Sequence, residues 1–151
     1  MLLLWKLLFG GATSTSLALD LGLLAARLWV GIPMAFIWGA AKIPPAPGFI
    51  TNVGNLGFPM PTFFAWCAAL SEVVGGALIA LGVMTRPATL LLGFTMFVAA
   101  FMQKADENFF DPSRLNPTHY LVFCVVLLLT GAGRLSVDQV LRPKPDGRGL
   151  R

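Results

Sequence analysis

Two charged residues lie inside long apolar stretches of the chain, and their chemistry needs an explanation first. Arg27 lies within residues 17–40 and Glu72 within residues 61–81. A charged side chain near the middle of a bilayer costs at least about 2.5 to 3.5 kcal/mol on insertion scales, so each needs a partner or a function. Each lies about ten residues, or about 15 Å, from the same expected membrane face. We therefore expect an Arg27–Glu72 salt bridge, which either fixes helix register or forms part of a proton-exchanging pocket.

A proline and a glycine pair lie near these two charges. Pro33 cannot donate a backbone hydrogen bond, so it leaves one carbonyl of its helix without a helical partner. Gly75 and Gly76 follow Glu72, and their missing side chains allow another helix or a flat ligand to come close. The glycines therefore indicate either close helix packing or, together with Arg27, a polar pocket.

The remaining chemically versatile residues are one histidine and two cysteines. His119 is expected at the outer end of a fourth span, where it acts as a hydrogen-bonded cap or as a ligand for a quinone carbonyl or a metal. Cys67 and Cys124 are expected at depths about 9 Å apart, whereas a disulfide needs Cα atoms within about 7 Å, so we predict two small apolar core residues. No Cys-x-x-Cys, Cys-x-x-Cys-His or His-Glu-x-x-His occurs, so we predict no metal site and no covalently bound haem.

The composition indicates that lipid surrounds the elements that position these residues. The chain has 151 residues, of which 56% are hydrophobic and 12% charged, against roughly 25% charged in an average soluble domain. At about 20 residues a span, this length allows about four membrane spans and leaves no room for a second, soluble catalytic domain. The net charge of +4 comes without a basic run interleaved with aromatics, which argues against a nucleic-acid partner.

The apolar stretches and their proline and glycine boundaries predict an all-α integral membrane protein, a four-transmembrane-helix bundle. The bundle is expected over residues 17–134, between an interfacial segment at 1–16 and a cytoplasmic tail at 135–151. In the tail, Ser136 is predicted to cap a short helix. The expected spans are about 17–40, 61–81, 88–103 and 118–132, with a short interfacial helix at about 49–56.

The positive charges outside the spans predict the orientation. Seven Lys and Arg residues fall on the side of the two termini and three on the opposite side. Because cytoplasmic segments carry the excess of Lys and Arg, we expect both termini in the cytoplasm and the bundle in the plasma (inner) membrane.

Several marked residues recur in a fixed order along the chain: Arg27, then Gly39-Ala40-Ala41-Lys42, Glu72-Val73-Val74-Gly75-Gly76, Gly82-Val83-Met84-Thr85-Arg86, and finally Gly131-Ala132-Gly133-Arg134-Leu135-Ser136-Val137-Asp138. Over residues 17–138 this order and spacing resemble the DoxX family of four-helix membrane proteins. Matches expected to be structural are Lys42, Gly76, Arg86, Arg134 and Asp138.

The resemblance implies a redox-linked role, because the family is linked to the small membrane subunit of thiosulfate:quinone oxidoreductase. We therefore expect a quinone-linked small subunit of a membrane oxidoreductase complex, rather than a self-contained enzyme, with quinone as its candidate cofactor and other subunits and the lipid bilayer as its partners. Glu72 is the candidate catalytic residue, and the candidate quinone-binding residues are Arg27, Glu72, Gly75 and His119. The lack of paired cysteines argues against thiol–disulfide exchange.

A non-catalytic structural or assembly subunit of a larger membrane complex is the alternative function, because the chain has few polar groups and no cofactor motif. A transporter is less favoured, since the spans show no polar stripe at helical spacing.

Overall fold

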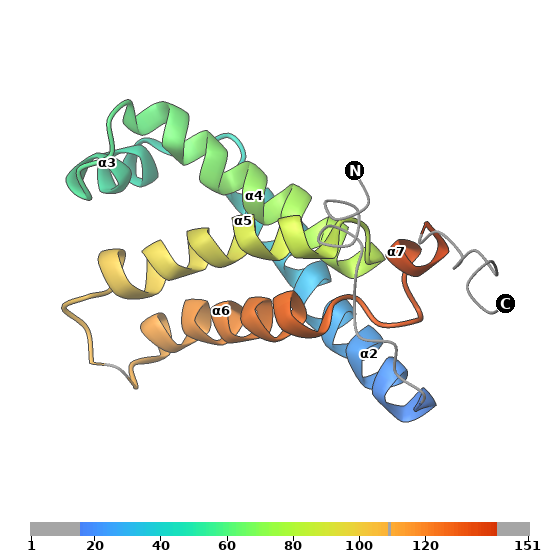
Figure 1. Ribbon diagram of the computed structural model, residues 1–151. Helices are drawn as coiled ribbons and strands as arrows, with labels where there is room; N and C mark the ends of the chain where they lie inside the picture. Colours follow the sequence, from blue (N-terminus) through green and yellow to red (C-terminus); the bar gives the residue numbers. More distant parts are fainter. Residues whose placement is uncertain (1–15, 109, 142–151) are drawn as a thin grey trace, which may run out of the picture.

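The computed structural model describes residues 16–108 and 110–141, in which every regular element is a helix and no strand occurs (Figure 1). The first half comprises α2 (Leu17–Pro33), the π-helical segment η1 (Met34–Gly39), the 3-10 turn η2 (Ala40–Lys42), α3 (Pro47–Asn55) and α4 (Pro61–Leu81). The second half comprises α5 (Thr85–Val98), the π-helical segment η3 (Ala99–Gln103), α6 (Pro112–Thr130) and α7 (Val137–Val140).

Three of these helices are long and apolar enough to cross a membrane: Leu17–Lys42, Pro61–Leu81 and Thr85–Gln103. The all-helical membrane fold is therefore confirmed, with boundaries within three residues of the predicted 17–40, 61–81 and 88–103. The short helix predicted at 49–56 is confirmed as α3, and Ser136 caps α7 by accepting a hydrogen bond from the Gln139 amide at 3.3 Å. Residues 1–15 and 142–151 lie outside the described residues.

The fourth predicted span corresponds to α6, which begins earlier than expected, at Pro112. The Asp111 side chain caps the helix by accepting a hydrogen bond from the Ser113 amide at 2.9 Å. The first turns of α6 are polar, and the helix runs beside α5 (Figure 1). A fourth crossing at 118–132 and the cytoplasmic position of both termini stay predictions.

Helices α2 and α4 approach each other backbone to backbone through a seam of small residues. A Cβ atom added to Gly31 would lie 2.5 Å from the Gly76 carbonyl oxygen and 2.7 Å from the Ala80 amide nitrogen. One added to Gly39 would lie 2.8 Å from the Val73 amide nitrogen. Gly76 therefore serves close helix packing, which in membranes depends on small residues. Gly75 faces α5 instead, at ordinary contact distances.

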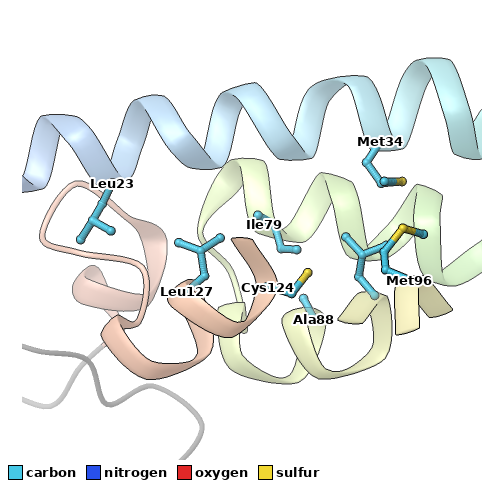
Figure 2. Close-up of a cluster of buried hydrophobic side chains, with 8 residues drawn as sticks. Leu23, Met34, Ile79, Ala88, Met96, Cys124 and Leu127 are labelled. Atoms are coloured by element: carbon cyan, nitrogen blue, oxygen red, sulfur yellow. The ribbon is translucent and has the colours of Figure 1, made fainter. Parts of the chain in front are cut away.

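One apolar cluster joins α2, α4, α5 and α6, and Cys124 lies within it (Figure 2). Cys124 is 2% exposed and free, as predicted for a small core residue. Cys67 is also free but exposed, so its predicted place in the core is wrong. The buried members of the cluster are Leu23, Met34, Ile79, Ala88, Leu92, Met96, Cys124 and Leu127.

The segment after α6 folds back onto the turn between α4 and α5. The Asp138 carboxylate accepts hydrogen bonds from the amides of Met84 at 2.7 Å and Thr85 at 2.9 Å. The Asp138 amide donates to the Gly82 carbonyl at 2.8 Å. A carboxylate is favoured there, because the first amides of a helix lack helical acceptors and carry the positive end of its dipole. Asp138 therefore joins the segment after α6 to the turn between α4 and α5.

Candidate functional site

The predicted Arg27–Glu72 salt bridge is wrong. The Arg27 guanidinium lies against Gly82, at the end of α4, and its Nη2 donates a hydrogen bond to the Leu135 carbonyl. The prediction assumed that α2 and α4 begin and end at one membrane face. Because Gly31 lies opposite Gly76, however, α2 extends well past the end of α4.

Arg27 belongs instead to a buried polar cluster that holds the C-terminal segment in place. It is fully buried, and Asp20, about two turns earlier on α2, is 2% exposed. Asp20 accepts a hydrogen bond from the Arg134 amide at 3.0 Å, and the two side chains form an ion pair at 3.9 Å. Arg86 lies half-buried in the first turn of α5. Through these contacts Arg27 and Arg134 join α2 to the segment after α6.

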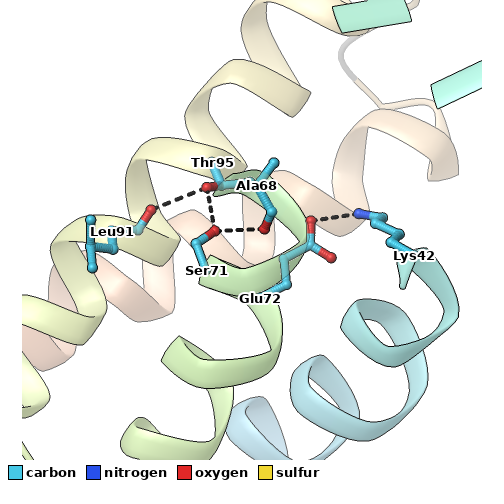
Figure 3. Close-up of polar contacts among 6 residues, drawn as sticks. All are labelled: Lys42, Ala68, Ser71, Glu72, Leu91 and Thr95. Carbon is cyan, nitrogen blue, oxygen red and sulfur yellow. Dashed lines mark hydrogen bonds and ion pairs between the residues drawn. The ribbon is translucent and has the colours of Figure 1, made fainter. Parts of the chain in front are cut away.

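The partner of Glu72 is Lys42, at the end of the 3-10 turn η2. Lys42 Nζ lies 2.5 Å from Glu72 Oε1, and the two side chains are 36% and 2% exposed (Figure 3). The Lys42 ammonium also lies 5.6 Å from the centre of the Phe49 ring, within range of a cation–π interaction. The second carboxylate oxygen, Glu72 Oε2, is buried and accepts no hydrogen bond from any described residue. Glu72 therefore has one oxygen committed to an ion pair and one without a partner.

The small-residue seam and the π-helical segment η1 bring these two side chains together. Pro33 directly precedes η1, and the amide of Ala40, just after η1, donates to the carbonyl five residues earlier, at Ala35. The packing of Gly39 on Val73 then brings the end of this stretch beside Glu72. π-Helical segments are rare and occur frequently at functional sites.

Beside Glu72, Ser71 and Thr95 join α4 to α5. Their hydroxyl oxygens lie 2.7 Å apart, and each hydroxyl also bonds a carbonyl of its own helix, Ala68 at 2.8 Å and Leu91 at 3.2 Å (Figure 3). These hydroxyls already have hydrogen-bond partners, so they line the site without needing a ligand to satisfy them.

A cavity of about 200 Å³ lies among α3, α4 and α5, and we call it the first cavity. The Lys42–Glu72 pair supplies its charged groups, and most of its wall is aromatic or aliphatic. The aromatic part of the wall comprises Phe49, Phe58, Phe64 and Phe94. Cys67 also lines this cavity, which accounts for its position outside the core.

A second cavity, also of about 200 Å³, lies on the other side of the pair, among η1, α4, η3 and α6. Its wall contains more polar side chains, which are Lys42, Glu72, Gln103, Lys104, Ser113, Asn116 and Tyr120. Four residues line both cavities: Lys42, Glu72, Ala99 and Gln103. The ion pair therefore stands between two cavities of different character.

Of the residues predicted from the sequence, Glu72 alone lies at these cavities as a candidate site residue. Arg27 and Gly75 line neither cavity, and His119 is exposed on α6 and also lines neither. Sequence reasoning missed Lys42 as a site residue, although a lone lysine between an apolar stretch and a proline-rich loop was its signal. Within residues 16–108 and 110–141, no three His, Cys, Asp or Glu side chains meet as a metal site requires.

Comparison with known proteins agrees with this picture of a membrane-embedded helical chain. "Putative oxidoreductase CatD" of Bacillus subtilis (strain 168) is 30% identical over 129 residues, which cover 85% of this chain and 93% of that protein. "Inner membrane protein YphA" of Escherichia coli (strain K12) is 31% identical over 124 residues, covering 78% and 88%. No solved structure matches the chain. The DoxX family model matches residues 22–105, a region that contains both Lys42 and Glu72. The chain therefore belongs to the DoxX family of membrane proteins.

Proposed function

We propose that this protein is a quinone-linked subunit of an oxidoreductase complex in the inner membrane, and that the first cavity binds the quinone ring. The observation that carries the proposal is the buried oxygen Glu72 Oε2, which has no described hydrogen-bond partner at the wall of an apolar cavity. A buried polar atom without a partner is costly, so its retention favours a ligand that satisfies it.

The dimensions and lining of the first cavity fit a quinone ring. An apolar cavity of about 150 Å³ binds benzene, and the first cavity measures about 200 Å³. Phe49 and Phe64 supply aromatic surfaces for a flat ring, and aromatic pairs contribute beyond their buried area. The residues present therefore fit an apolar ring that carries polar oxygens.

The Lys42–Glu72 pair would bind and orient the oxygens of such a ring. A bound quinone supplies a couple that takes up two electrons and two protons. The Lys42 ammonium has donors left beyond its bond to Glu72, and it can donate one to a carbonyl oxygen. Glu72 Oε2 can hold or release a proton beside that carbonyl oxygen of the ring, while Glu72 Oε1 keeps the Lys42 ammonium in place.

The names of the two relatives support the redox and membrane parts of this proposal. One is named as an oxidoreductase and the other as an inner membrane protein. We propose that electrons come from a partner subunit, that α6 forms a fourth span and that both termini face the cytoplasm. Labelling of single cysteines placed in the 104–111 loop and near residue 137, from each side of the membrane, tests this orientation.

Binding of a short-chain quinone to the purified protein in mild detergent, followed by fluorescence quenching, tests the proposed site. We expect Glu72→Gln and Lys42→Met to weaken binding roughly tenfold or more, because a hydrogen bond to a charged group contributes about 1.5 to 3 kcal/mol. Glu107→Gln is the matched control, since Glu107 forms a surface ion pair with Lys104 at 2.7 Å.

Equal binding by wild type and Glu72→Gln, with the fold intact, would count against the proposal. The alternative of a non-catalytic assembly subunit predicts that outcome. It also predicts that deletion of the protein lowers the amount of its partner, and that Glu72→Gln restores that amount as fully as wild type.

A further inference from the structure

We propose that the second cavity holds water and is the path by which Glu72 exchanges protons with the aqueous phase beside the α5–α6 loop. This goes beyond the proposed function, because it concerns proton access to Glu72 whatever ligand the first cavity binds. The first cavity would then bind an apolar ligand, and the second would carry protons.

The second cavity leads from the buried carboxylate to exposed polar residues. At its inner end Glu72 is 1% exposed and lies with the buried methionines of η1 and α5. At its outer end lie Gln103 and Asn116, which are exposed and flank the loop between η3 and α6. Asp106 and Glu107 in that loop place it in water or among lipid headgroups. The outer end of the cavity is therefore at an aqueous surface.

The polar groups of the second cavity suit water. A buried water needs two to four polar partners and roughly 10 to 15 Å³ of accessible volume. The second cavity offers about 200 Å³ and, besides the ion pair, the side chains of Gln103, Asn116 and Tyr120. Glu72 Oε2, which no described residue hydrogen-bonds, would have water from the second cavity as its partner while the first cavity holds no ligand.

The first cavity is a poor path for protons, because few of its polar groups are available to hydrogen-bond water. Its hydroxyl groups, on Ser71 and Thr95, bond each other and the carbonyls of their own helices. Asn52 and Gln103 are its other uncharged polar side chains, and Gln103 belongs to both cavities. Most of the remaining wall is aromatic or aliphatic and gives water few partners. Protons would therefore reach Glu72 from the second cavity.

Carbodiimide cross-linking of the detergent-purified protein tests this access without any quinone. A carbodiimide activates the Glu72 carboxyl group, and the Lys42 amine, 2.5 Å away, then displaces a urea to form an amide bond. Mass spectrometry of the joined peptides measures the rate. A water-soluble, cationic carbodiimide reports on the aqueous path, and dicyclohexylcarbodiimide reports on access from the apolar phase.

We expect the water-soluble reagent to cross-link the wild-type protein. In Asn116→Phe the same reaction should be about tenfold slower, because a phenyl ring at the outer end of the second cavity lets the reagent enter only when the structure opens locally, which is rare. Dicyclohexylcarbodiimide should cross-link Asn116→Phe at about the wild-type rate, which shows that the ion pair is intact. His119→Phe is the matched control, an exposed α6 position that lines neither cavity. Asn52→Phe, at the first cavity, should leave the water-soluble reaction unchanged.

The proposal is overturned if the water-soluble reagent fails on wild type, if Asn116→Phe reacts like wild type, or if Asn52→Phe slows the reaction equally. Should Asn116→Phe misfold and lose both reactions, Asn116→Leu replaces it, since it removes the amide with little change in volume. Loss of quinone binding in Glu72→Gln concerns the first cavity alone, so the two proposals fail separately.

Discussion

Replacing Gly31 by alanine tests whether the small-residue seam sets the register of α2 against α4. The added Cβ would lie 2.5 Å from the Gly76 carbonyl oxygen and 2.7 Å from the Ala80 amide nitrogen. Both are backbone atoms, so no side-chain rotation can relieve the contact, and the two helices must separate. Gly22 on the same helix is the control, because its added Cβ meets nothing within 4 Å.

The magnitude follows from two opposing effects. Overpacking a well-packed contact costs about 1 to 3 kcal/mol. Alanine is favoured over glycine within a helix by roughly 0.5 to 1 kcal/mol, and this gain applies to both positions. The difference in unfolding free energy between Gly31→Ala and Gly22→Ala therefore isolates the contact, and we expect Gly31→Ala to be less stable by about 1 to 3 kcal/mol.

Reversible unfolding by sodium dodecyl sulfate in mixed micelles measures this difference for both variants under one condition. The Lys42–Glu72 cross-linking rate should fall in Gly31→Ala as well, because the same seam brings the pair together. Equal stability of the two variants would refute the assignment of register to these backbone contacts.

Two further predictions concern the helix caps. Asp138→Ala removes the carboxylate that caps α5, so we expect a loss of about 0.5 to 2 kcal/mol by the same unfolding assay, against little change for the exposed Asp106→Ala. At α6, hydrogen bonds from the Ser113 hydroxyl and amide lower the pKa of Asp111 below its ordinary value. This cap is therefore fully present above the ordinary aspartate pKa and lost as the pH falls through the lowered one. Amide hydrogen exchange at Ser113 should accelerate over that range relative to its intrinsic rate, and Asp111→Ala should abolish the pH dependence.

The sequence predicted the helices well because their boundaries are local. Residues 61–81 form an uninterrupted apolar stretch between Pro61 and Gly82, and the structure gives α4 the same bounds. The short α7 followed from Ser136 as its cap. The largest boundary error is the start of α6, since the polar turns after Asp111 resemble a loop by composition. The π-helical segments η1 and η3 were not predicted.

The pairing of the charges could not be predicted in the same way. The pairing depends on the axial offset between two neighbouring helices. Equal depth in the membrane predicts that offset only if the two helices end at the same depth. The contact of Gly31 with Gly76 fixes the axial offset of α2 against α4. This offset places Lys42 rather than Arg27 beside Glu72. Glu72 was predicted as a site residue because a carboxylate in an apolar stretch stands out, whereas each cavity is formed by several segments that are distant in sequence.

The polar cluster around Arg27 has a consequence for biogenesis. Arg27 and the Leu135 carbonyl are separated by 108 residues, and Asp20 and Arg134 by 114. At a synthesis rate of about 5 to 20 residues per second, Arg27 leaves the ribosome about 5 to 20 seconds before its acceptor. During that interval Arg27 and Asp20 of α2 have not met their native partners. Synthesis of residues 134 and 135 therefore allows this cluster to close, and a ribosome that stalls before Leu135 releases a product that lacks this closure.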